Sequence, residues 1–197
     1  MAINVKSENL VLRLWFLMHR DYRLLVRCED QIYGEYGLTM EQYSVLAAMK
    51  YIGGPARPTE IARWLGRSAN AVSMIIDRMV KAGLVRRVRD RRDRRVVNVS
   101  MTSKGENALK LATPAGWEFI QKIVSPLSSE DRRTFERLLE ILRYETLSYL
   151  SHGEDIEAIV VNDDKNHLNM MERLFHDALP STPQAKRQAG KKGKTVR

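Results

Sequence analysis

The sequence has very little cysteine and no long apolar run, and each shortage excludes a class of protein. Cys28 is the only cysteine among 197 residues, so neither an internal disulfide framework nor a multi-cysteine metal site can form. The longest apolar stretch in the N-terminal third, residues 14–18, is far below the roughly 20 residues of a membrane-spanning helix. The first residues lack the basic region and apolar core of a secretory signal. We therefore expect a cytoplasmic protein without a membrane segment.

Motifs of catalysis are also missing from the sequence. It contains no phosphate-binding glycine loop, no zinc-binding His-Glu-x-x-His, no nucleophile elbow and no paired catalytic carboxylates in a pocket-forming pattern. His167 and His176 stand among acidic residues, but these side chains are too scattered for a metal site, and we interpret both histidines as surface residues. The sequence predicts neither an enzyme nor a bound metal or cofactor.

Positive charge is in excess, and it is concentrated in two segments. The chain carries 33 lysines and arginines against 24 acids, a formal charge of +9 with a pI near 9.8. Residues 180–197 hold six cations and no acid, which leaves 27 cations against 24 acids elsewhere. Residues 86–95 hold seven arginines and two aspartates. Such a density of like charge repels itself unless an anion is near, so the pattern indicates a nucleic acid as partner.

Helical spacing of apolar residues dominates the first half of the chain. It predicts a long helix over residues 7–33, a second helix capped by Thr39 and stopped at Gly53, and a short third helix over residues 58–65. Ser68 is a good N-cap for a fourth helix that runs to about Lys81. The third and fourth helices are joined by a short turn that contains a glycine, which is the spacing of a helix-turn-helix.

Beyond residue 83 the spacing of apolar residues changes from a period near 3.6 residues to one near 2. Residues 84–89 and 96–101 therefore predict a β-hairpin with a charged tip, and together with the helix-turn-helix a winged helix results. Thr102 and Ser128 can each cap a further helix. Residues 153–179 are amphipathic with a polar break at 162–164, and residues 180–197 are too polar to fold. The expected fold is mainly α with a small β-hairpin.

Three segments of the chain resemble the MarR family of bacterial transcription regulators: residues 38–46 (Leu-Thr-Met-Glu-Gln-Tyr-Ser-Val-Leu), 72–85 and 93–105. The resemblance extends over roughly residues 10–150. It implies a winged helix-turn-helix between N- and C-terminal dimerisation helices, in a homodimer that binds double-stranded DNA and is often released by a small-molecule effector or by oxidation. Within the resemblance the implied divisions are 1–37 (dimerisation helix), 38–102 (DNA-binding region) and 103–152 (dimerisation helices). Beyond it, the residue pattern predicts an amphipathic extension over 153–179 and a disordered basic tail over 180–197.

The start of the fourth helix has the small polar side chains that a major-groove helix needs. Asn70 can bond adenine edges, Ser73 a base or a phosphate, and Ala71 can approach a thymine methyl. For Ser68 we favour a capping role, and for Asn70 and Ser73 a groove contact. The candidate DNA-binding residues of this helix are Ser68, Asn70, Ala71, Ser73, Met74 and Arg78. For Arg78 a phosphate contact and an ion pair with neighbours of Asp77 remain open.

The wing supplies the second set of candidate DNA contacts. Arginine suits narrow minor grooves, where the negative potential is focused. By resemblance, Asp93 orients Arg95, which enters the minor groove, while Arg92 and Arg94 lie along the phosphates. A solvated charge run is the alternative interpretation of this segment.

The broad apolar surface of the first helix predicts a second subunit, because one neighbouring helix does not cover so wide a stripe. We expect its leucines to pack with residues of the 130–150 helix and of a partner chain. The candidate dimerisation residues are Leu10, Leu14, Leu17, Phe135, Leu138 and Leu142.

The sequence is least informative about sensing. By resemblance, an effector lies between the dimerisation helices and the winged helix, where Trp15, His19, Arg23 and Tyr43 could line a cleft. Cys28 stands at an apolar position, and we interpret it as a buried, inert thiol. Residues 153–179 could extend the dimer, cover the ligand cleft or recruit a protein. The predicted function is a dimeric repressor on a pseudo-palindromic operator; the alternative is an architectural protein that coats DNA without sequence preference.

Overall fold

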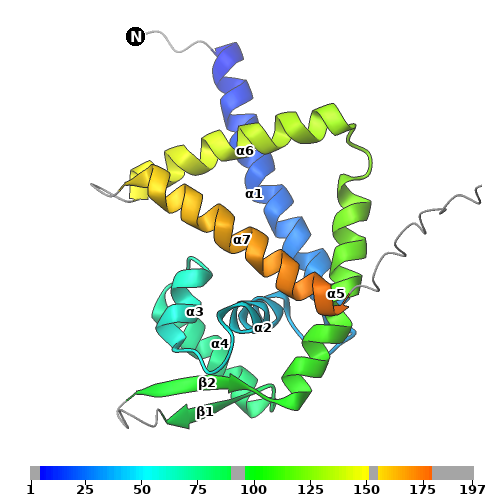
Figure 1. Ribbon diagram of the computed structural model, residues 1–197. Helices are drawn as coiled ribbons and strands as arrows, with labels where there is room; N and C mark the ends of the chain where they lie inside the picture. Colours follow the sequence, from blue (N-terminus) through cyan, green and yellow to red (C-terminus); the bar gives the residue numbers. More distant parts are fainter. Residues whose placement is uncertain (1–4, 90–95, 151–154, 179–197) are drawn as a thin grey trace, which may run out of the picture.

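The computed structural model describes residues 5–89, 96–150 and 155–178, and in these ranges the chain is helical apart from one hairpin (Figure 1). The elements are α1 (Val5–Gly34), α2 (Met40–Ile52), α3 (Pro58–Trp64), α4 (Ala69–Lys81), β1 (Val85–Arg89), β2 (Val97–Met101), α5 (Ser103–Val124), α6 (Ser129–Leu150) and α7 (Ile156–Ala178). The predicted fold, mainly helical with a winged helix-turn-helix, is confirmed.

Side-chain caps fix the starts of three helices where the sequence predicted them. Thr39 Oγ1 accepts from the Gln42 amide at 3.2 Å, and the Gln42 side chain accepts from the Thr39 amide at 3.0 Å. Ser68 Oγ accepts from the Ala71 amide at 3.2 Å. Ser128 and Asp131 cap α6 in the same reciprocal way. Each cap satisfies amide groups that the first helical turn leaves without a partner.

The wing is an antiparallel pair in which Val85 lies opposite Met101 and Arg89 opposite Val97. Ala56 adds an isolated β-bridge to this pair, since its amide and carbonyl both bond to Val99, at 2.9 and 2.8 Å. Ala56 and Val99 are fully buried, so the hairpin is attached to the helix-turn-helix through its base. The core beneath it comes chiefly from α2, α3 and α4, and its largest fully buried side chains include Leu46, Ile61, Ile76 and Met79.

At the junction between the wing and α5, the start of α5 lies close against the backbone that follows α4. Thr102 Oγ1 donates to the carbonyl of Gly83 at 2.7 Å and accepts from the Gly105 amide, so it joins the end of α4 to the start of α5. Lys104 Nζ donates to the Ala82 carbonyl at 2.9 Å. A Cβ on Gly105 would stand only 2.2 Å from the carbonyl oxygen of Leu84. The first turn of α5 therefore requires glycine at this position.

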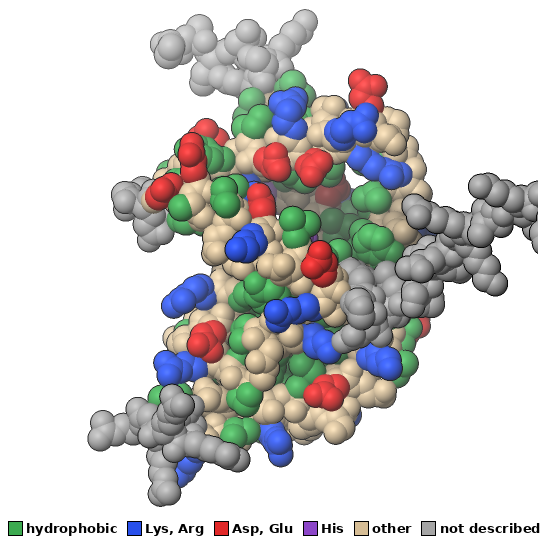
Figure 2. All heavy atoms as spheres, viewed as in Figure 1, with side chains coloured by type: hydrophobic (Ala, Val, Ile, Leu, Met, Phe, Trp, Pro, Cys, Tyr) green, Lys and Arg blue, Asp and Glu red, His purple; other side chains and the backbone are tan. Residues whose placement is uncertain are grey.

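The N-terminal part of α1 and all of α6 have no buried side chain among the residues for which burial is described. Every residue from 9 to 25 is exposed, and so are the large apolar residues of α6 apart from Leu147, which is half-buried. Figure 2 shows hydrophobic side chains at the surface in the upper part of the molecule, where α6 lies. Apolar surface on this scale marks an interaction site in a soluble protein.

The α7 helix returns from the end of α6 to the winged helix, so that α5, α6 and α7 form three sides of a triangle in Figure 1. It runs without interruption through residues 162–164, so the predicted polar break is wrong. Contacts with distant residues stabilise these positions: Arg143 pairs with Asp164 at 2.8 Å, and Tyr51 donates to Asn166 Oδ1 at 2.7 Å. Leu174 is buried against α2 and α5, whereas Leu168 is 66% exposed.

Two tyrosines join α1 and α2 to α5. The rings of Tyr33 and Tyr43 stack at 4.1 Å, and Tyr43 donates to Thr113 Oγ1 at 3.3 Å. Burial raises the pKa of Tyr43 above its ordinary value of 10.0, and burial, with the neighbouring Tyr43, raises that of Tyr33 further. Both phenols therefore stay protonated in the folded chain at pH values where they ionise in the unfolded chain.

This difference predicts how stability depends on alkaline pH. Because the folded pKa values lie above the unfolded ones, the contribution of the two tyrosines is complete below pH 10.0 and is lost as the pH rises beyond it. The free energy of unfolding, measured with urea between pH 8 and about 11, should fall at the alkaline end. Tyr43→Phe retains the stacked ring and should reduce that fall. An equal alkaline loss in the variant would contradict this assignment.

Candidate nucleic-acid interface

The α4 helix turns one polar stripe toward solvent. Val72, Ile75, Ile76 and Met79 are buried on one side, as the helical period requires. On the opposite side a single stripe is exposed, formed by Asn70, Met74, Asp77 and Lys81. Met74 is 66% exposed, which is unusual for a large apolar side chain with core on the other face of its helix. This stripe is the part of the helix-turn-helix that is free to enter a groove.

The other predicted residues of α4 take different positions. Ala71 and Ser73 are half-buried and flank the stripe on opposite sides. Ser68 is exposed and is occupied as the N-cap, in agreement with the role that the sequence favoured. Asn70 and Met74 are thus the predicted residues that lie centrally on the exposed stripe.

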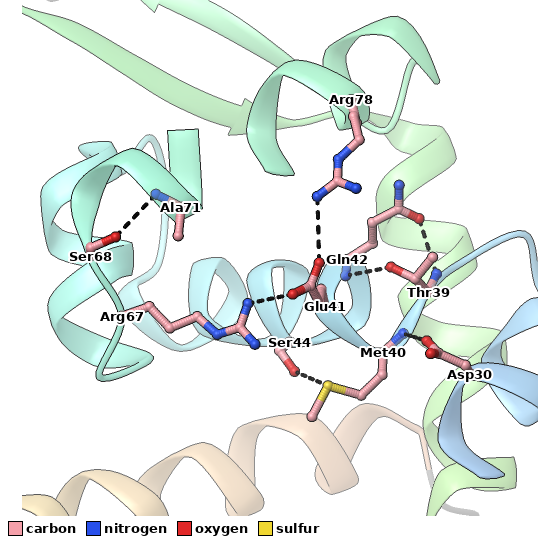
Figure 3. Close-up of polar contacts among 10 residues, drawn as sticks. All are labelled: Asp30, Thr39, Met40, Glu41, Gln42, Ser44, Arg67, Ser68, Ala71 and Arg78. Carbon is pink, nitrogen blue, oxygen red and sulfur yellow. Dashed lines mark hydrogen bonds and ion pairs between the residues drawn. The ribbon is translucent and has the colours of Figure 1, made fainter. Parts of the chain in front are cut away.

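Glu41, at the start of α2, holds two arginines of the helix-turn-helix (Figure 3). Its carboxylate lies 2.6 Å from Arg67 Nη1 and 3.5 Å from Arg78 Nη2. The hydrogen bond to Glu41 raises the pKa of Arg67. Arg78 therefore makes an ion pair with Glu41 of α2, rather than with a neighbour of Asp77. Arg78 is still exposed and stands beside the stripe, so a phosphate could compete for it.

The wing is tied to α4 by a further ion pair, between Arg87 Nη2 and Asp77 Oδ1 at 2.6 Å. Arg86 and Arg89 of the same strand are exposed. Asp77 and Arg87 were not among the predicted site residues, although this exposed pair joins β1 to α4. Lys81 was also missed, and its spacing of eleven residues from Asn70 along one helix face was the available signal.

The predicted wing residues Arg92, Asp93, Arg94 and Arg95 lie outside the described residues. The strands on either side of them, β1 and β2, are described.

The predicted dimerisation residues lie on α1 and α6, and the single chain leaves them uncovered. Leu10, Leu14 and Leu17 are exposed, as are Phe135, Leu138 and Leu142. Within one chain, therefore, the α1 leucines and the α6 residues do not cover one another as predicted. Both faces remain available to another molecule.

The four predicted effector residues do not form one pocket in a single chain. The rings of Trp15 and His19 are in contact at 4.4 Å, and both side chains are exposed together with Arg23. Tyr43 stacks on Tyr33 instead, and Tyr33 lies about 27 Å along the helix axis from Trp15. Cys28 is half-buried, so the expectation of a fully buried thiol is wrong for the isolated chain.

Within residues 5–89, 96–150 and 155–178, no three histidine, cysteine or acidic side chains are grouped so as to hold a metal ion. No helix in the same ranges combines the length and apolarity needed to cross a bilayer.

A winged helix with an exposed polar α4 and an arginine-rich β1 defines a class of DNA-binding protein. Comparison with known proteins agrees with this class and identifies a family within it. The model of the MarR family matches residues 36–96. The transcriptional activatory protein BadR of Rhodopseudomonas palustris is 31% identical over 151 residues, which are 72% of this chain and 82% of BadR. The regulator PecS of Dickeya dadantii is 28% identical over 59% of this chain and 71% of PecS.

Solved structures agree in fold. The organohalide-sensing regulator RdhR, in its 2,4-dichlorophenol-bound form, superposes with a TM-score of 0.69 at 21% identity, over 78% of this chain and 90% of RdhR. A MarR mutant from E. coli, complexed with operator DNA, superposes with a TM-score of 0.62 at 24% identity, over 68% of this chain and 96% of the MarR chain. The chain belongs to the MarR family. It is a DNA-binding transcription regulator and not an enzyme, as the sequence predicted.

Proposed function

We propose that this regulator binds a pseudo-palindromic operator as a homodimer, with α4 in the major groove and the wing in the adjacent minor groove. The observation that carries the proposal is the exposed stripe of α4 beside the arginines of β1, with the two surfaces linked by the Arg87–Asp77 ion pair. In this arrangement Asn70 and Ser73 read base edges and Ala71 and Met74 contact apolar base surfaces. Arg92 and Arg94 bind phosphates, and Asp93 orients Arg95 in the minor groove.

The dimer is supported by the uncovered apolar faces of α1 and α6. A two-fold axis would bury the same surface on both subunits and would present two α4 helices, one to each half-site. Half-sites about one helical turn apart then lie on one face of the duplex. The MarR and MepR proteins, which share the fold, have been solved with DNA.

The proposal includes repression: where the operator overlaps a promoter, the bound dimer excludes polymerase. Release by a small molecule completes the proposal. Its support is the fold shared with RdhR, which was solved with 2,4-dichlorophenol.

Substitution of the reading residues tests the DNA interface. Asn70→Ala should weaken binding to the operator by about tenfold and relax base preference at one position per half-site, because one bidentate contact to adenine is lost. Arg95→Ala should weaken binding and reduce its dependence on salt and on minor-groove width. Fluorescence anisotropy with DNA from the region flanking the coding sequence, at several salt concentrations, measures both effects.

Lys165→Ala on α7 is the matched control, since it removes an exposed cation remote from α4 and should leave operator affinity unchanged. If both reading variants bound as tightly as the parent, the proposed interface would be wrong. Competition with random DNA separates a regulator from an architectural protein, because specific binding exceeds nonspecific binding by at least about 1000-fold. Equal affinity for random DNA would favour the architectural alternative.

A further inference from the structure

The Glu41 carboxylate lies between two arginines that come from opposite ends of α4 (Figure 3). Arg67 stands in the turn before α4, and Arg78 is in its last turn. The eleven residues between them correspond to roughly 16 Å along a helix axis. The two side chains can therefore meet one carboxylate only by reaching toward each other along the flank of α4, on the side of Ala71, which is two helical turns from Arg78.

The two contacts of the carboxylate are unequal. Glu41 Oε1 lies 2.6 Å from Arg67 Nη1, whereas Oε2 lies 3.5 Å from Arg78 Nη2, and the Arg78 side chain is 63% exposed. Glu41 is also the main cause of the raised pKa of Arg67, to which Tyr22 of α1 adds. Arg67 thus anchors the carboxylate, and the second oxygen directs Arg78 through a longer contact.

The backbone that carries Glu41 is fixed at the start of α2. Asp30 Oδ1 of α1 accepts from the Met40 amide at 2.7 Å, and Thr39 caps the helix. Glu41 therefore projects from a backbone that is bonded to the dimerisation helix α1, and it sets the direction of a cationic side chain at the edge of the exposed α4 stripe.

A directed arginine matters more for one kind of DNA complex than for another. When α4 is seated in its operator, the nearest phosphates have fixed positions, and a guanidinium that already points along α4 loses little freedom on contact. Glu41 engages one of the five N–H donors of Arg78, so the others can donate to a phosphate. On random DNA α4 is not seated, and net charge dominates the affinity.

We propose that Glu41 is a positioning residue that increases operator specificity by directing Arg78 toward a phosphate at the edge of the major groove. This inference rests on the proposed binding mode of α4. It adds to that mode a residue of α2 that acts through Arg78 and does not itself contact DNA.

Glu41→Gln tests the proposal, because it keeps the shape of the side chain and removes its charge. The measured quantity is the ratio of two affinities: that for a duplex which the parent protein enriches from a random-sequence pool, and that for a random duplex of equal length. This ratio should fall by about fivefold, the upper end for an exposed ion pair. The added net charge strengthens both complexes and cancels in the ratio, whereas positioning is lost on the enriched duplex alone.

Arg78→Gln shows whether Glu41 acts through Arg78. This variant should lower the slope of log affinity against log salt by about one on the enriched duplex, since one phosphate contact is lost. Adding Glu41→Gln to it should not lower the ratio further, so the two effects are not additive.

Asp164→Asn is the matched control. It removes the acid of another exposed ion pair, the one with Arg143 that joins α6 to α7 away from α4, and it changes the net charge by the same amount. The ratio should not change in this variant. Circular dichroism verifies that all variants are folded. A lower folded fraction, for example from the loss of a favourable charge at the start of α2, would weaken both complexes equally and leave the ratio unchanged.

Each outcome supports or overturns a defined statement. An unchanged ratio in Glu41→Gln, with a parent that prefers its enriched duplex, overturns the role of Glu41 and leaves the proposed function intact. An equal fall of the ratio with and without Arg78→Gln shows that Glu41 acts through the fold of α4, which also overturns positioning of Arg78. A parent that enriches no duplex overturns the proposed function, and the role of Glu41 in specificity with it.

Discussion

Leu138→Glu is expected to convert the protein from a dimer into monomers that no longer bind a palindromic operator. Leu138 is 46% exposed on α6 in the single chain, within the apolar face that we assign to the dimer. A carboxylate without a partner in such an interface costs about 3 kcal/mol, and the two-fold axis introduces it twice. The dimerisation constant should therefore fall by several orders of magnitude. Light scattering coupled to size-exclusion chromatography gives the mass directly.

The matched control for this substitution is Leu168→Glu. Leu168 is a leucine on α7 that is 66% exposed and lies outside the set predicted for dimerisation. This variant should remain dimeric and bind the operator as the parent does. A dimeric Leu138→Glu with full operator affinity would show that α6 is not in the interface.

Gly105→Ala is expected to have the largest effect on folding. The added Cβ would meet the Leu84 carbonyl oxygen at 2.2 Å and Met101 Cγ at 3.1 Å. The first obstacle is backbone, so α5 must move away from β1 and weaken the Thr102 bonds to Gly83 and Leu84. Overpacking of this kind costs about 3 kcal/mol. Urea denaturation followed by circular dichroism measures the loss.

Gly34→Ala provides the comparison. A Cβ at Gly34 meets no atom within 4 Å, and the backbone there does not have a positive φ. Because alanine is a better helix former than glycine, this variant should be as stable as the parent or slightly more stable. If Gly105→Ala were equally stable, the close approach of α5 to Leu84 would not limit the fold.

The local features of the fold could be predicted from sequence because their causes are local. Thr39, Ser68 and Ser128 each stand directly before a helix and bond to an amide within three residues. Thr102 was predicted as a helix cap from the residue pattern, whereas Gly105 was singled out by resemblance alone. Its physical reason, the contact of Gly105 with Leu84, joins residues 21 positions apart and becomes visible only in the structure.

Features that depend on distant contacts could not be predicted. The polar residues 162–164 resemble a helix break, but Asp164 pairs with Arg143 of α6, and Asn166 nearby bonds to Tyr51 of α2. Arg78 has no acidic partner one helical turn away, and its ion pair with Glu41 spans 37 positions. Tertiary contacts of this kind determine most helix stability, which local propensity does not report.

The exposed start of α1 links the folding of this protein to the amount of it that is present. Residues 9–25 have no neighbour that removes them from water in one chain, and a helix without tertiary contacts is marginal in aqueous solution. If a second subunit supplies those contacts, dilution should fray α1 and lower the melting temperature by mass action. A cell that makes little of the regulator would then hold a larger fraction of it incompletely folded and open to proteolysis.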